Sequence, residues 1–87
     1  MSKDRELIEL TLQVLQHYRR LAERSRALEE VQRHLVSMME YGTVSKILVE
    51  TEKAMVETMK SEVNDLRKEA EEAEIALRKF KEKNIHI

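Results

Sequence analysis

Residues 7–35, LIELTLQVLQHYRRLAERSRALEEVQRHL, carry the heptad repeat that decides the fold. Every seventh position holds an aliphatic side chain, namely Leu7, Val14, Leu21, Leu28 and Leu35. An apolar residue kept at one heptad position over five repeats predicts a long helix that packs against a second helix. The positions three residues later are Leu10, His17, Arg24, Val31 and Met38. We therefore expect an apolar stripe with a polar middle.

The second half of the chain continues the pattern in steps of three and four residues. Its apolar positions are Val44, Leu48, Thr51, Met55, Met59, Val63, Leu66, Ala70, Ala73, Leu77 and Phe80. Between the halves lies Gly42, the only glycine of a chain without proline. Glycine suits the position after a helix C-terminus, and Thr43 is a plausible N-cap for a following helix. The pattern predicts helices over residues 4–40 and 44–83 with a turn at 41–43. One continuous helix is the alternative, because a lone glycine costs only about 1 kcal/mol against alanine.

Folding the chain back at Gly42 places position i opposite position 84 − i. The apolar partners are then Leu7 with Leu77, Val14 with Ala70, Leu21 with Val63, Leu28 with Met55, and Leu35 with Leu48. The same fold sets an arginine-rich stretch (residues 19–33) beside a glutamate-rich one (residues 50–69). Complementary flanking charges select the orientation of paired helices. We therefore expect an all-α protein, an antiparallel two-helix hairpin of the coiled-coil type. An antiparallel pair between two chains satisfies the same pattern.

More apolar surface is present than one hairpin seam uses. A second line holds Ile8, Leu12 and Leu15, extended by Val36 and Met39 and, in the second helix, by Ile47, Val56, Ile75 and Ala76. A wide apolar face is typical of helices in bundles of three or more. We expect two hairpins to assemble as a four-helix bundle, or one hairpin to bind a helical partner. The predicted assembly seam is Leu7, Val14, Leu21, Leu28, Leu35, Leu48, Met55, Val63 and Leu77.

Length and composition exclude several classes of protein. The chain has 87 residues, of which 38% are charged and 41% hydrophobic, with a net charge of −1 and no cysteine. Such a chain is short for an enzyme, and it offers no disulfide framework, thiolate metal site or cysteine nucleophile. It shows neither a secretory signal nor an apolar run long enough to span a membrane. We expect a soluble intracellular protein with no membrane partner, in a compartment that the sequence does not indicate.

No residue pattern indicates chemistry. His17, His34 and His86 lack the spacing of helical metal ligands, and His17 falls at a seam position, where a polar residue can set register. The glutamates at 69–74 form an open run, which gives solvated carboxylates instead of a catalytic pair. Serines without an elbow motif and the absence of a glycine-rich loop complete the picture. We predict no catalytic, cofactor-binding or metal residue, no cofactor, and no enzymatic activity.

Two further features suggest alternative functions. Residues 17–34 hold the one basic cluster, with Tyr18 available for stacking, so a Rop-like RNA-binding bundle is possible; interrupting glutamates and the net charge of −1 disfavour nucleic acid. Residues 41–50, YGTVSKILVE, resemble the tip of prefoldin subunits, where helical arms flank a short β segment. The resemblance covers about ten residues, and this chain is shorter than that family, without room for its β hairpins. It implies a small chaperone or holdase.

The pattern as a whole favours a protein–protein interaction or oligomerisation module. Such a module serves as a scaffold, an adaptor or a small subunit of a larger complex. Its partner would be a second copy of itself, a helical protein, or both. Methionines gather around the predicted turn, and methionine is over-used at adaptable binding surfaces. The predicted docking residues are Val36, Met39, Ile47 and Met59.

Overall fold

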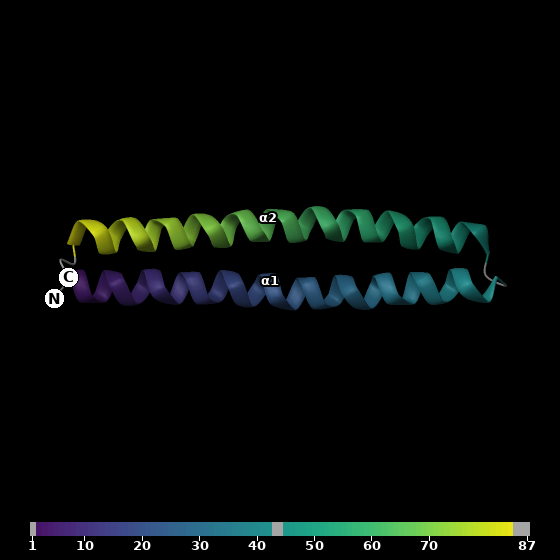
Figure 1. Cartoon of the computed structure of the whole chain (residues 1–87), viewed down its shortest axis with the longest axis horizontal. Helices are drawn as coiled ribbons and strands as arrows, with labels where there is room; N and C mark the ends of the chain where they lie inside the picture. The colour runs from purple at the N-terminus through teal and green to yellow at the C-terminus, as the bar shows by residue number, and fades with distance from the viewer. Residues whose placement is uncertain (1, 43–44, 85–87) are drawn as a thin grey trace.

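The chain folds into two antiparallel helices joined by one turn (Figure 1). The structure is a computed structural model and describes residues 2–42 and 45–84. Helix α1 runs over Ser2–Tyr41 and helix α2 over Lys46–Asn84. The molecule is a rod with extents of 63 × 19 × 14 Å, and the start of α1 and the end of α2 lie at the same end of it. The predicted all-α hairpin is confirmed, and a single continuous helix through Gly42 is excluded.

The turn depends on a glycine and a serine. Gly42 follows the last residue of α1 and has a φ of +62°, the left-handed conformation that glycine adopts without a Cβ penalty. Ser45 caps α2, because its Oγ accepts a hydrogen bond from the backbone N–H of Ile47 at 3.2 Å. Its carbonyl oxygen accepts the N–H of Val49, also at 3.2 Å. The predicted cap Thr43 and the predicted first helical residue Val44 lie outside the described residues.

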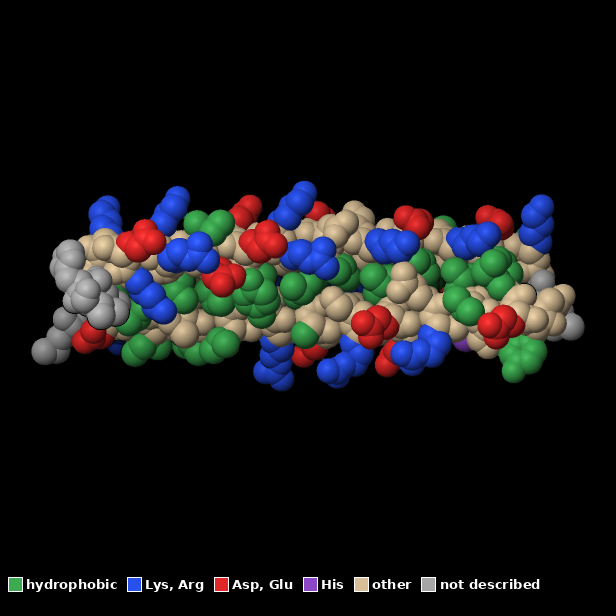
Figure 2. Space-filling view, viewed as in Figure 1, with side chains coloured by type: hydrophobic (Ala, Val, Ile, Leu, Met, Phe, Trp, Pro, Cys, Tyr) green, Lys and Arg blue, Asp and Glu red, His purple; other side chains and the backbone are tan. Residues whose placement is uncertain are grey.

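The core is a thin seam between the helices, and its deepest side chains all belong to α2. They are Val56, Met59, Val63 and Ala70. In the described α1, Ser2–Tyr41, the seam residues are half-buried at most. Three of these four side chains are small, and the smallest, Ala70, is the most deeply buried at 0% exposure. Figure 2 shows this seam as hydrophobic side chains between the helices, with charged groups on the outer edges.

The seam of α2 differs from the predicted one over its first turns. From Met59 to Phe80 the predicted positions line the seam, but Leu48 and Met55 are exposed, whereas Val49 is half-buried and Val56 is buried. The spacing chosen from sequence took three successive steps of four residues, from 51 to 63. Such steps drift off a seam that needs alternating threes and fours. Strict alternation backwards from Met59 leads to 56, 52 and 49, and the residue at 52 is a glutamate.

Two contacts between the helices fix the register. Arg24 Nη2 lies 2.7 Å from Glu62 Oε2, and His34 Nδ1 lies 3.4 Å from Glu52 Oε1. Both join position i to position 86 − i, whereas folding at Gly42 predicts 84 − i. The reason is the length of the turn, because α2 begins at Lys46 and the reversal is therefore centred just beyond Gly42.

Candidate interaction surfaces

The predicted assembly seam divides between the inside and the outside of the hairpin. All five heptad residues of α1, from Leu7 to Leu35, are half-buried against α2, as is Leu77 on the other side, while Val63 is buried. Leu48 and Met55 lie outside the seam. Most of these residues are therefore used within one chain, and of the predicted seam Leu48 and Met55 belong to the exposed surface.

Large hydrophobic side chains gather around the turn end of the rod. Three of the four predicted docking residues, Val36, Met39 and Ile47, are exposed there, Ile47 at 77%. Tyr41, Leu48 and Met55 are exposed as well and enlarge this group. Met59 is the exception, since it is only 6% exposed and belongs to the core. It cannot dock a partner unless the hairpin opens. We call the six exposed residues Val36, Met39, Tyr41, Ile47, Leu48 and Met55 the tip patch.

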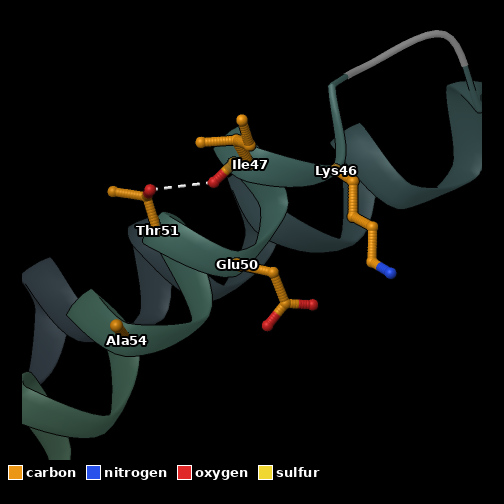
Figure 3. A pocket seen from close by; sticks show the side chains of 5 residues that line it. All are labelled: Lys46, Ile47, Glu50, Thr51 and Ala54. Carbon is orange, nitrogen blue, oxygen red and sulfur yellow. Dashed lines mark hydrogen bonds between the residues drawn. The ribbon is translucent and has the colours of Figure 1, made fainter.

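The apolar surface of the tip patch continues along the first turns of α2. A shallow depression there is lined by Lys46, Ile47, Glu50, Thr51 and Ala54 (Figure 3). The Thr51 hydroxyl donates to the backbone oxygen of Ile47 at 2.8 Å, so its polar atom is engaged within the helix. Its methyl group is left to continue the surface between Ile47 and Ala54. This line, one helical turn per step, presents carbon to the solvent.

A second exposed apolar group lies on α1 towards the end of the rod where α1 starts and α2 ends. Ile8, Leu12 and Leu15 are all exposed, as the periodicity predicts, and so is Ile75 on α2. Figure 2 shows hydrophobic side chains along the outer edge of α1 at this end. Val56, which the periodicity places in the same outer line, is instead buried in the seam. Exposed apolar surface of this kind makes this end of α1 a candidate interaction surface.

The basic cluster of α1 is partly engaged in ion pairs. Arg24 donates to Glu62 across the seam, with Nε and Nη2 both 2.7 Å from the same carboxylate oxygen. Arg19 pairs with Glu23 on its own helix at 3.3 Å. Both pairs are exposed to solvent, where an ion pair contributes only about 0–1 kcal/mol. The pair between Arg24 and Glu62 favours the antiparallel orientation, and both pairs reduce the positive charge available to a nucleic acid.

Tyr18 also bridges the helices. Its hydroxyl donates a hydrogen bond to the Glu74 carboxylate. That bond, followed by partial desolvation and the negative charges of Glu74 and Glu71, raises the pKa of the Tyr18 phenol above its ordinary value of 10.0. The phenol is thereby held as a donor to α2, so it is not a free stacking platform.

His17 lies in the seam, as its heptad position predicts. It is half-buried, and its Nδ1 is buried without a hydrogen-bond partner. A buried polar atom of this kind costs stability. His34 lies on the edge of the seam beside Glu52, a half-buried residue that the apolar pattern passed over. His86 lies outside the described residues.

Over residues 2–42 and 45–84, no group of three or more histidine, aspartate or glutamate side chains is placed to hold a metal ion. None of the described helical segments is both long and apolar enough to cross a membrane. No family model, curated protein or solved structure matches the chain.

Proposed function

We propose that this chain is a protein–protein interaction module, a rod that joins itself or another helical protein into a larger assembly as a scaffold, adaptor or small subunit. The observation that carries the proposal is the balance of apolar surface. Among the described residues, eleven large hydrophobic side chains are exposed while four hydrophobic side chains are buried. A helix pair without a partner is expected to carry polar residues on its outer faces instead. No catalytic or cofactor role is part of the proposal.

Photo-crosslinking in the host cell tests the proposal. Benzoylphenylalanine at Val36, and separately at Ile47, should yield protein adducts, because both positions are exposed and apolar. The matched control is the same amino acid at Glu23, which is exposed on a charged part of α1. Adducts at Val36 or Ile47 that exceed those at Glu23 support the module. Adduct yields equal at all three positions reject it.

A small holdase is the second candidate, favoured by the tip patch. Exposed side chains such as Tyr41 and Ile47 at the end of a rod could shield an unfolded chain. The purified protein should then suppress the aggregation of a chemically denatured model enzyme, and Ile47→Lys should abolish the suppression. The control is Ile75→Lys, an exposed apolar residue far from the tip. If the parent protein and the Ile75→Lys control both fail to suppress aggregation, the holdase is rejected.

A further inference from the structure

One stripe along α1 is almost uncharged, exposed or half-buried, and outside the seam, and it meets α2 through the hydrogen bond from Tyr18 to Glu74. Starting at Ile8 and stepping alternately three and four residues, ten positions lead to Met39, and only Glu29 among them is charged. Ile8 and Leu15 are exposed near one end of the stripe and Val36 and Met39 near the other. Of the polar residues in this stripe, Thr11 uses its hydroxyl within the helix, because it donates to the Leu7 carbonyl at 2.7 Å. We call these ten positions the α1 stripe.

The neighbouring stripe of α2 has the opposite character. The same stepping from Glu50 to Lys81 meets ten positions, of which only Asn64 is uncharged. Both stripes border one face of the rod. The hydrogen bond from Tyr18 to Glu74 joins them, and a shallow groove is shared by Val36, Lys53 and Lys60. This face is therefore almost uncharged along one helix and charged along the other.

The positions of the α1 stripe are spaced symmetrically about its centre. Its small residues, Ala22 and Ser25, lie at its centre, and its large apolar residues lie at both ends. If the stripe meets a second copy of itself running in the opposite direction, position i faces position 47 − i. Ile8 then faces Met39, and Ala22 faces Ser25. An isologous interface about a twofold axis requires this self-complementarity, and small central residues allow two helices to approach closely.

We propose, on the basis of the interaction module argued above, that the partner is a second copy of this chain, with α1 packed antiparallel on α1 about a twofold axis between Ala22 and Ser25. The result is a four-helix bundle. The stripe spans about 47 Å of helix at 1.5 Å per residue, so the contact extends over most of the rod.

Charge complementarity on α2 supports the same axis. Through the hairpin register of 86 − i, the axis passes near residues 62 and 63, and position i of α2 faces a residue close to 125 − i of the second copy. Lys53 then lies near Glu71 of the second copy, and Glu57 lies near its Arg67. Glu50 meets Glu74, a like-charged pair, although the Glu74 carboxylate already accepts the Tyr18 hydrogen bond. A twofold axis along the rod would instead lay the apolar α1 stripe on the charged stripe of α2.

Distances between spin labels separate the two arrangements. The chain has no cysteine, so single labels can be placed through Glu9→Cys and Glu23→Cys, which lie outside both the seam and the stripe. In the proposed dimer the two labels at position 9 are offset by about 44 Å along the rod, and those at position 23 by less than about 5 Å. An axis along the rod makes the offset close to zero for both labels and overturns the proposal. A monomer, which gives no dipolar signal between chains, overturns it as well.

A pair of matched variants tests the surface itself. Leu15 is 60% exposed within the α1 stripe, and Ile75 is 45% exposed on the outer side of α2. Because a twofold axis doubles each change, Leu15→Lys should weaken self-association in sedimentation equilibrium by roughly 100-fold or more. Ile75→Lys should leave it within about threefold. Equal effects of the two variants overturn the proposed contact.

The same measurements distinguish this inference from the proposed function. A monomeric chain that still forms adducts with another protein at Val36 loses the dimer and keeps the module. A monomer without such adducts loses both. A dimer with the predicted label distances and the predicted response to Leu15→Lys establishes the inference.

Discussion

The position of the α2 seam gives the sharpest test of the structure, because two adjacent residues exchange roles. Val56 is 5% exposed and Met55 is 47% exposed, whereas the apolar spacing of the sequence favours Met55 as the seam residue. Replacing each in turn by alanine asks which of them is held between the helices. Methionine loses more atoms than valine in this substitution, so size alone predicts the opposite order.

The magnitudes follow from burial. Val56→Ala removes two buried methyl groups at about 0.8 kcal/mol each. The cavity left behind adds to this loss, while alanine regains roughly 0.5 kcal/mol of helix propensity over valine. The net destabilisation is about 1–2 kcal/mol. Fully burying a methionine is worth about 1.5–3 kcal/mol, and Met55 is almost half exposed, so Met55→Ala should cost about 1 kcal/mol or less.

The assay is urea unfolding followed by circular dichroism, at one protein concentration for all variants, because the proposed dimer would make stability depend on concentration. A lysine pair widens the gap. Val56→Lys forces a charge into the seam and should lower the urea midpoint far more than Met55→Lys, which extends into water. If Met55→Ala destabilises as much as Val56→Ala, or if the two lysine variants unfold together, the seam of α2 passes through position 55 and the register argued above is wrong.

Three further predictions test individual side chains. His17→Leu should stabilise the protein by roughly 1–3 kcal/mol in the same unfolding assay, because it removes a buried nitrogen without a partner. The control at the exposed neighbour, Gln16→Leu, should change the stability by no more than about 0.5 kcal/mol. A destabilised His17→Leu variant would show that the imidazole has a hydrogen-bond partner. Gly42→Ala should lower the stability by about 1 kcal/mol, because φ is +62° there. An added Cβ would meet no atom within 4 Å, so the cost is conformational alone. Gly42→Asn should cost less, and an alanine variant of raised stability would show that the backbone at this position is helical. In a Tyr41→Phe background, absorbance titration of Tyr18 should give a midpoint above 10.0, and Glu74→Gln should lower that midpoint. Because the pKa of Tyr18 is raised in the folded protein, the stabilisation by its hydrogen bond to Glu74 is present below pH 10 and is lost as pH rises through the raised pKa. A midpoint that Glu74→Gln leaves unchanged would contradict the hydrogen bond.

The hairpin itself could be predicted because three independent features of the sequence agree. An aliphatic residue at five successive heptad positions requires a partner helix, Gly42 provides the one place for a reversal, and the opposed charge runs select the antiparallel direction. Each is a local property of the chain, and none depends on detailed packing. The structure adds the contacts, such as that between Arg24 and Glu62, which fix the register two positions away from the predicted one.

The first turns of α2 could not be predicted in the same way, because apolarity and helical period disagree there. Choosing the apolar residue at every step leads through Met55 to Leu48, whereas the period leads through Val56 and accepts Glu52 in the seam. A half-buried glutamate is tolerable because the seam is thin and His34 lies 3.4 Å away. Unbroken alternation of threes and fours was the signal that could have found it. Met59, predicted to dock a partner, is core because it lies at a position of the apolar spacing that the seam keeps.

The exposed residues of the predicted docking set and the α1 stripe lie outside the hairpin seam for the same reason. A seam between two helices uses about one third of the circumference of each, and α1 carries leucines, isoleucine and valine beyond that third. The polar middle of its seam, at His17 and Arg24, limits how much the hairpin can gain from its own contact. With no cysteine to form a disulfide, a chain of this size commonly gains the remaining stability from association. Ala22 and Ser25 lie at the same level of the rod as this polar middle. A second copy packed on the α1 stripe would therefore reinforce the hairpin where its own seam is weakest, and folding and assembly would be coupled through one helix.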